Sequence, residues 1–190
     1  MPSAEIARLR QIIKAEYQEI PAGTYHGVVL KEAQSGAKLR RVEIRHLSAD
    51  ALVIFPDKGQ DGIGCLSPML DQSTGQAFNK ACDAVIYCTH KGVHYRVLCE
   101  LKSDTVKGVA AQFTGTLCFL GYLEAILRQA FNEQPVVRHT RRIVFNSLKS
   151  ACHTLDKAPV NPRDAALLDD QRITYLLAQN DAAFGLGALI

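Results

Sequence analysis

Hydrophobic residues near the start of the chain recur every three or four positions, which is the spacing of one helix face. The residues with this spacing are Ile6, Leu9, Ile13, Tyr17 and Ile20. Ser3 stands before them as an N-cap, and Pro21 with Gly23 ends the pattern. The chain is therefore expected to open with a single amphipathic helix.

The pattern then changes to short segments of β type. Residues 24–30, 40–46 and 51–55 each indicate a strand, because apolar residues alternate with polar ones or form a compact run. Residues 56–80 are rich in Gly, Ser, Gln and Asp, and loops of this length in compact domains are usually functional or mobile. We expect a β meander followed by a loop that borders the site.

Two further β-rich segments flank Lys91-Gly92, which suits the two-residue loop of a hairpin. Counting outward from that loop places Asp83 opposite Glu100, and alternation puts Lys102 on the same face as both. The opposite face receives apolar residues, namely Ala84, Ile86, Cys88, Tyr95, Val97, Cys99 and Leu101. One face of the hairpin is therefore expected to be apolar and to pack in the core. The other face is expected to carry three charged groups at one end.

A long apolar helix follows the hairpin. It is expected from about residue 106 to residue 130, with Ser103 or Asp104 as its cap, and residues 134–146 indicate a further strand. The apolar stretch 108–123 falls short of the ~20 residues that a membrane span needs, so we interpret it as part of a buried helix and expect no membrane association.

The end of the chain predicts a linker and one more helix. The linker is 157–162, Asn161 can cap the helix and Pro162 can begin it. Its apolar side would consist of Leu167, Leu168, Ile173, Leu176 and Leu177. The tail 182–190 is small and apolar, which suits packing on the body of the protein or on a partner subunit.

Composition narrows the class of protein. The chain has 190 residues, of which 47% are hydrophobic and 22% charged, with a net charge of +3, as in ordinary globular domains. A nucleic-acid partner would therefore have to be held by local basic clusters. These clusters are Lys38, Arg40, Arg41, Arg45 and Arg138, Arg141, Arg142, Lys149.

Six cysteines, without a CxxC pair and several within apolar segments, favour reduced, buried thiols over disulfides. The N-terminal segment also lacks a secretory apolar core. We therefore expect a cytoplasmic protein.

The three polar residues of the hairpin suggest a chemistry. Opposed carboxylates such as Asp83 and Glu100 repel one another unless a positive group lies between them, and Mg²⁺ is commonly held by one or two carboxylates. The ammonium of Lys102 can position a water molecule or stabilise charge that develops on a phosphate. This combination suits metal-assisted hydrolysis of a phosphodiester.

Asp83 and the sequence Glu100-Leu101-Lys102, followed by a helix, resemble the PD-(D/E)xK superfamily of restriction-endonuclease-like nucleases. The resemblance implies an α/β fold with a mixed central β-sheet flanked by helices, here followed by a C-terminal helical extension. It assigns 1–156 to the nuclease-like domain and leaves 157–190 as the linker and C-terminal helix. Cys82 stands where the motif has its proline.

The resemblance also implies roles for the site residues. Asp83 and Glu100 would bind Mg²⁺ or Mn²⁺, the carbonyl of Leu101 would add a ligand, and Lys102 would orient or activate water. Gln112 lies where some relatives place a glutamine on the following helix. Glu16 and Glu19 are alternative candidates for an additional acidic ligand.

The function implied is metal-dependent cleavage of DNA, internally rather than from the ends, within restriction or anti-phage defence. Arg40, Arg41, Arg138, Arg141 and Arg142 would contact phosphates. The alternative is a catalytically inactive module of the same fold that binds nucleic acid or a protein partner. The sequence leaves open DNA or RNA as substrate, duplex or single strand, the recognition sequence, and whether the chain works as a homodimer or within a larger complex.

Overall fold

The computed structural model describes residues 3–23, 25–32, 36–56, 58, 80–103, 106–136, 138–147 and 169–190, with side chains from 172 onward in the last range. Several sequence expectations fall outside these residues. They concern most of the loop 56–80, the linker 157–162, and Cys65, Asp104, Lys149, Cys152, Asn161, Pro162, Leu167 and Leu168.

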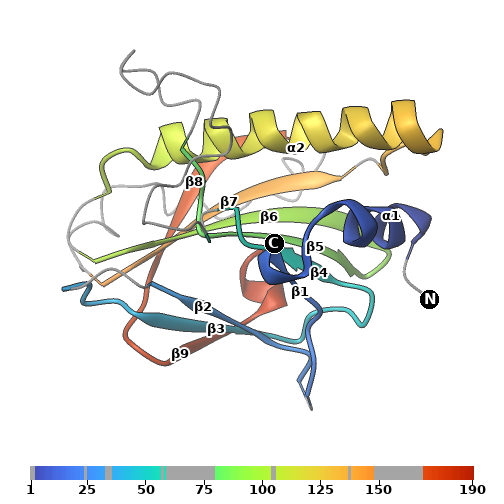
Figure 1. The fold of residues 1–190 in the computed structure, drawn as a ribbon. Coiled ribbons are helices and arrows are strands. Elements are labelled where there is room, and N and C mark those ends of the chain that lie inside the picture. The colour runs from blue at the N-terminus through green and yellow to red at the C-terminus, as the bar shows by residue number, and fades with distance from the viewer. Residues whose placement is uncertain are drawn as a thin grey trace.

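The described chain contains two α-helices, two short 3₁₀ helices and nine strands (Figure 1). The α-helices are α1 (Ala4–Ile12) and α2 (Val109–Phe131), and the 3₁₀ helices are η1 (Ala15–Tyr17) and η5 (Leu186–Ala188). The strands are β1 (Gln18–Glu19), β2 (Val28–Lys31), β3 (Arg41–Arg45), β4 (Leu52–Ile54), β5 (Ala84–His90), β6 (Val93–Lys102), β7 (His139–Asn146), β8 (Asp169–Leu177) and β9 (Ala182–Gly185).

Six strands form a mixed central sheet in the order β1-β4-β5-β6-β7-β8. The pairs from β1 to β6 are antiparallel, whereas β6, β7 and β8 are mutually parallel. The helix α2 connects β6 to β7, which makes a β-α-β unit, the usual connection between parallel strands. The expected α/β class with a mixed central sheet is therefore confirmed.

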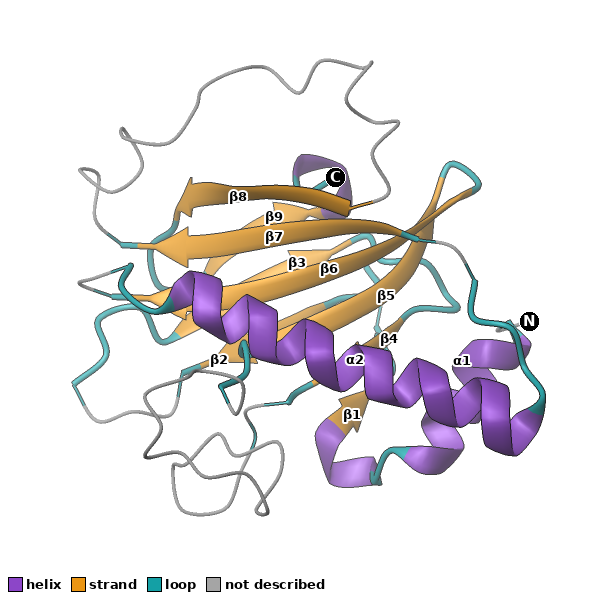
Figure 2. Cartoon of the chain, turned by 90° about the horizontal axis from the view of Figure 1, so that it is seen from above, coloured by secondary structure: helices purple, strands orange, loops and turns teal. Residues whose placement is uncertain are grey.

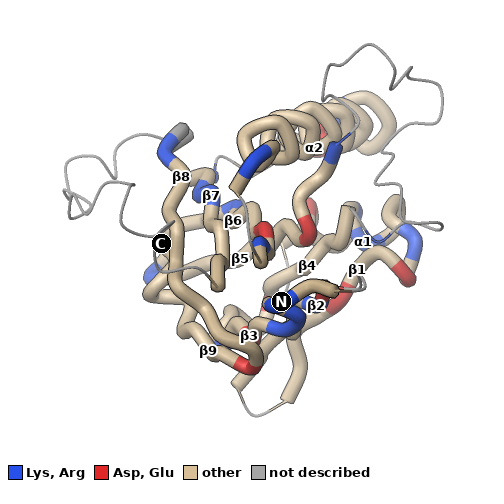
Figure 3. The backbone as a smooth tube through the Cα atoms, turned by 90° about the vertical axis from the view of Figure 1, so that its left-hand side faces the viewer, with Lys and Arg blue, Asp and Glu red and all other residues tan. Residues whose placement is uncertain are grey.

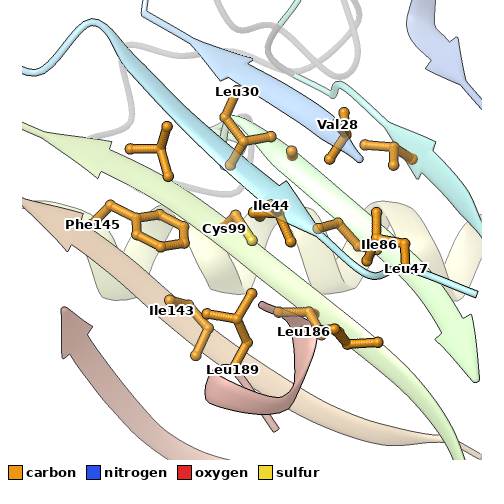
Figure 4. Close-up of a cluster of buried hydrophobic side chains, with 14 of the residues drawn as sticks. Val28, Leu30, Ile44, Leu47, Ile86, Cys99, Ile143, Phe145, Leu186 and Leu189 are labelled. Atoms are coloured by element: carbon orange, nitrogen blue, oxygen red, sulfur yellow. The ribbon is translucent and has the colours of Figure 1, made fainter. Parts of the chain in front are cut away.

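A second sheet of three strands, β2-β3-β9, lies against one face of the central sheet (Figure 1). Apolar side chains from both sheets fill the space between them (Figure 4). Alternate residues of β5 and β6 point into this core, including Ile86, Val97 and Cys99. The apolar face predicted for the hairpin is thus confirmed as a core surface.

Both α-helices cover the opposite face of the central sheet, along which the long helix α2 runs (Figure 2). Ile6 and Leu9 of α1 share one apolar cluster with Phe113 and Leu120 of α2. The expectation of helices flanking the sheet therefore holds for one face, because the small sheet covers the other.

The long apolar helix lies within three residues of its expected start and one of its expected end. Among the described residues, α2 is the one helix long and apolar enough to cross a membrane, and about a third (33%) of its most apolar window is buried. Its sheet-facing side is buried, whereas Cys118 and Tyr122 are exposed. The helix is therefore buried along one side only.

The first helix is shorter than predicted. Ser3 caps it as expected, through a hydrogen bond from the Ile6 N–H to its Oγ atom (3.3 Å), but α1 ends at Ile12. Residues 18 and 19 instead pair with β4 at the edge of the central sheet. Pairing of the backbone with β4 thus replaces the last helical turns.

The predicted C-terminal helix is wrong. Residues 169–177 form β8, which lies parallel to β7, and 182–185 form β9, which lies parallel to β3. The spacing of Ile173, Leu176 and Leu177 fits a helix face, but residues 173–175 (Ile-Thr-Tyr) also favour a strand. Hydrogen bonding to the edge of β7 selects the strand. The tail does pack on the body, since Leu186 and Leu189 are buried.

Four cysteines lie in the described residues, and none of these forms a disulfide. Cys82, Cys88 and Cys99 are buried as expected, and burial raises the pKa of all three thiols, that of Cys88 to about 12. Cys118 is exposed, contrary to the expectation of buried thiols.

Candidate active site

The hairpin has the predicted register. Lys91-Gly92 forms the turn, both residues have positive φ, and Ala84 pairs with Cys99 at the far end. Asp83 comes directly before β5, and Glu100 comes directly after Cys99, the last residue of β6 that pairs with β5. The two acidic residues therefore lie side by side at the carboxyl end of β6, the end at which open α/β sheets commonly bind ligands.

Two hydrogen bonds connect Asp83 to the end of β6, one to Glu100 and one to Leu101. The N–H of Asp83 donates to Oε2 of Glu100 (3.2 Å), and the N–H of Leu101 donates to Oδ2 of Asp83 (2.6 Å). Each carboxylate thus accepts a backbone N–H from the other strand. This exchange holds the two carboxylates at the end of the hairpin.

The carboxylate of Glu100 is buried and has further donors. Its Oε1 atom accepts a hydrogen bond from Nε2 of Gln112 (2.6 Å) and lies 2.6 Å from Nζ of Lys102. Burial raises the pKa of the Glu100 carboxyl, while Lys102, Gln112 and the Asp83 N–H act in the opposite direction. Three groups of the chain therefore offset part of the cost of burying this charge, and burial remains the larger effect.

The first turns of α2 fix the segment that leads to Asp83. Nε2 of Gln112 also donates to the carbonyl of Ala81 (3.3 Å), and one turn later Oγ1 of Thr116 accepts the N–H of Cys82 (2.8 Å). Residues four apart share a helix face, so both polar side chains meet the same backbone segment. The helix thereby sets the position of Asp83 relative to Glu100.

The predicted site residues therefore come together, including Gln112 from the helix. The carbonyl of Leu101 belongs on the Asp83 side of β6, because the N–H and C=O of one strand residue face the same neighbour. Glu16 and Glu19 are exposed, and β4 lies between their segment and β5. Among the described residues, no three His, Cys, Asp or Glu side chains form a metal-binding group.

The donor set available to a cation is consequently small. Asp83, Glu100 and the Leu101 carbonyl are oxygen donors, the kind that Mg²⁺ prefers, and Mg²⁺ commonly completes its shell with water and substrate phosphate. The residues present therefore fit a magnesium or manganese ion, and in this structure Lys102 is the cation beside Glu100.

Ser103 was expected as a possible N-cap of α2, but it does not cap the helix. Gly108, with φ 82°, precedes the helix, and no side chain caps it. Ser103 instead accepts the backbone N–H groups of Lys38 and Leu39 at its Oγ atom (2.8 and 3.0 Å). The residue after Lys102 thus joins the central sheet to the chain that leads into β3.

Three of the five arginines expected to contact phosphates are largely buried. Arg138 forms an ion pair with Glu5 (2.7 Å), and the two side chains are 7% and 2% exposed. Arg141 and Arg142 are each 8% exposed and, as consecutive residues of β7, point to opposite faces of the sheet. These three residues do not form an exposed basic surface, and that expectation is corrected.

The other two arginines are exposed. Arg41 forms an ion pair with Asp181 (2.6 Å), whereas Nε of Arg40 donates to the carbonyl of Ala37 (3.0 Å). Lysine and arginine positions lie on several of the segments that meet at the end of the molecule at which α2 begins (Figure 3).

Sequence reasoning missed three residues that organise this end: Ser103 as a link between segments, Thr116 and Asn180. Thr116 left a signal, since it is a polar residue one turn after Gln112 on an apolar helix. Ser103 and Asn180 left none, because their partners are distant in sequence.

None of the protein-family models, curated proteins or solved structures compared with this chain matches it.

Proposed function

We propose that this chain hydrolyses phosphodiester bonds of DNA in a reaction that depends on Mg²⁺ or Mn²⁺. The observation that carries the proposal is the convergence of Asp83, Glu100 and Lys102 at one end of the β5–β6 hairpin. Two carboxylates with an ammonium beside them suit metal-assisted attack on a phosphate.

The order of elements supports the proposal. A first helix, an antiparallel meander β4-β5-β6 carrying the acids, the helix α2 and the parallel strand β7 follow in the order that a PD-(D/E)xK nuclease implies. The chain departs from that pattern in having both helices on one face of the sheet and a small sheet on the other.

Each residue has a distinct part in the proposed reaction. Asp83, Glu100 and the Leu101 carbonyl would hold the metal ion, which would acidify a bound water and polarise a phosphate oxygen. Lys102 orients the attacking water and stabilises negative charge that develops on the phosphate. Gln112 keeps the Glu100 carboxylate in place through its 2.6 Å hydrogen bond.

The test is cleavage of plasmid and linear DNA, and of RNA, with Mg²⁺, with Mn²⁺ and with EDTA. Asp83→Ala, Glu100→Ala and Lys102→Ala should each abolish cleavage while the protein remains folded by circular dichroism. Glu124→Gln is the matched control, because it breaks an ion pair outside the site, that of Glu124 in α2 with Arg96 in β6 (2.8 Å). Parental rates in all three site variants would refute the assignment.

A second candidate is a binding module of the same fold without catalysis. The observation that favours it is that both oxygens of Glu100 already have donors within the chain, so the cluster is complete without a cation. Binding of nucleic acid that is equal with Mg²⁺ and with EDTA, without turnover of any substrate, would support this second function.

A further inference from the structure

The segment 38–40 lies directly beside the proposed site. The N–H groups of Lys38 and Leu39 both donate to Oγ of Ser103, and Ser103 follows Lys102 in the chain. This segment belongs to the approach to β3, more than sixty residues earlier in the sequence. The fold thus brings a second basic stretch to the end of β6.

The side chains of this segment alternate between core and solvent. Leu39 is fully buried between the two sheets, whereas Lys38 and Arg40 on either side of it are exposed. In an extended segment, neighbouring residues point in opposite directions. Burial of Leu39 therefore directs Lys38 and Arg40 outward.

A second side chain holds the same segment from the other side. Asn180, in the turn between β8 and β9, accepts the N–H of Arg40 at Oδ1 (2.5 Å) and donates from Nδ2 to the carbonyl of Lys38 (2.7 Å). Together with Ser103, it gives residues 38–40 four hydrogen bonds to side chains. A backbone held in this way loses little conformational entropy when a ligand binds.

Arg40 and Arg41 differ in whether a carboxylate pairs with them. Arg41 faces Asp181 at 2.6 Å, whereas no carboxylate of the described residues forms an ion pair with Arg40. The Nε atom of Arg40 is held by Ala37, which leaves the two Nη groups for an external acceptor. A planar guanidinium with two donors matches the oxygens of a phosphate.

We propose that residues 38–40 bind the phosphate backbone of a nucleic acid, next to the phosphodiester bond that is cleaved at the site containing Lys102. Arg40 is the main contact, and Ser103 and Asn180 are positioning residues. That the ligand is a nucleic acid rests on the proposed function. The new element is that this ligand reaches the site along the edge where the two sheets meet. Contacts of this kind give affinity without sequence preference.

The experiment measures binding of a fluorescent 20-base-pair duplex DNA, in EDTA and over a range of salt concentrations. Arg40→Ala should weaken binding about fivefold to tenfold at 0.1 M salt and reduce the slope of log K against log salt by about 0.9, the loss of one phosphate contact. Arg128→Ala, an exposed arginine in the last turn of α2, is the matched control and should bind as the parent does.

A variant with the opposite sign sharpens the test. Asp181→Asn releases Arg41 from its exposed ion pair and should strengthen binding several-fold while steepening the salt slope by about 0.9. Asparagine tolerates the positive φ of 64° at this position, and exposed ion pairs contribute little to stability, so the fold should be retained.

Asn180→Ala tests the positioning role. It should weaken binding in the parent but have no further effect in the Arg40→Ala background, since it acts through that side chain. Parental binding by Arg40→Ala, no gain with Asp181→Asn, additive losses in the double variant, or no DNA binding by the parent would each overturn the inference.

The outcomes separate this inference from the proposed function. A chain that binds DNA through Arg40 in EDTA but cuts nothing with Mg²⁺ or Mn²⁺ would refute the hydrolysis and leave the binding surface. A chain that cuts DNA, and whose Arg40→Ala variant binds and cuts at parental levels, would refute the surface and leave the hydrolysis.

Discussion

The Oε1 atom of Glu100 lies 2.6 Å from the Nζ atom of Lys102, two positions further along β6. The Glu100 side chain is 2% exposed and that of Lys102 21%, so the ammonium approaches from the solvent side of a buried carboxylate. In the proposed reaction, a divalent cation bound to Glu100 would compete with this ammonium for the same oxygen. Lys102 would then be available to the substrate.

Lys102→Met should separate metal binding from catalysis. Removal of the competing ammonium should strengthen Mn²⁺ binding, measured by titration calorimetry, because Glu100 loses its resident cation. Cleavage should fall about 10²- to 10³-fold, the usual loss when a group that stabilises transition-state charge is removed. Lys14→Met, at an exposed position far from the site in sequence, should change neither quantity. Weaker Mn²⁺ binding in Lys102→Met would contradict the competition.

Gln112→Ala should lower the rate of DNA cleavage by about 10- to 100-fold, the range for groups that orient a metal ligand. Its amide holds both Glu100 and the carbonyl of Ala81, so its loss frees both sides of the site. Thr114→Ala is the control, since Thr114 is exposed and bonds only within its own helix, to Ala110. Equal rates in the two variants would show that Gln112 is a structural amide alone.

The pKa of Glu100 predicts a component of the pH dependence of stability. Burial raises the pKa in the folded protein above its ordinary value, so the folded state binds the proton more tightly than the unfolded state. The free energy of unfolding should therefore fall as the pH rises from the ordinary carboxyl pKa to the raised one. Urea unfolding in EDTA should show this decline in the parent and a smaller one in Glu100→Gln. Identical pH profiles would mean that Glu100 titrates at its ordinary pKa.

Glu5→Ala should destabilise the protein by about 3–5 kcal/mol, because it leaves the Arg138 guanidinium buried without its carboxylate. Arg138 also lies 4.9 Å from the centre of the Tyr87 ring, which adds to its burial. Thermal unfolding measures the loss. The double variant Glu5→Leu/Arg138→Met, with two apolar side chains, should recover most of it. A loss below about 1 kcal/mol would show that water reaches Arg138 in the parent.

The part of the site that depends on local spacing could be predicted from the sequence. A two-residue loop at Lys91-Gly92 determines every pair of the hairpin, and so places Asp83 beside Glu100. The resemblance to the nuclease motif added Gln112, whose partner Glu100 lies only 12 residues earlier in the chain. Turn length is a local property, so no distant partner was needed to place Asp83 beside Glu100.

The parts that depend on distant partners could not be predicted. Residues 173–177 have spacing that fits a helix, and only the open edge of β7 makes them a strand. Arg138 belongs to a basic cluster in the sequence, but Glu5, 133 residues earlier, takes it into the interior. The partners of Ser103 and Asn180 are equally remote. Charge clusters along a strand therefore do not show which side chains reach the surface.

The most direct test of the central claim is the position of Mn²⁺, located by its anomalous scattering in crystals grown with that ion. One ion is expected between the carboxylates of Asp83 and Glu100, with Lys102 withdrawn from Oε1 of Glu100. Glu100→Gln should lose the ion, and Glu124→Gln should keep it. Crystals of the active parent in which Glu100 still pairs with Lys102, and in which the ion lies elsewhere, would rule out this metal site.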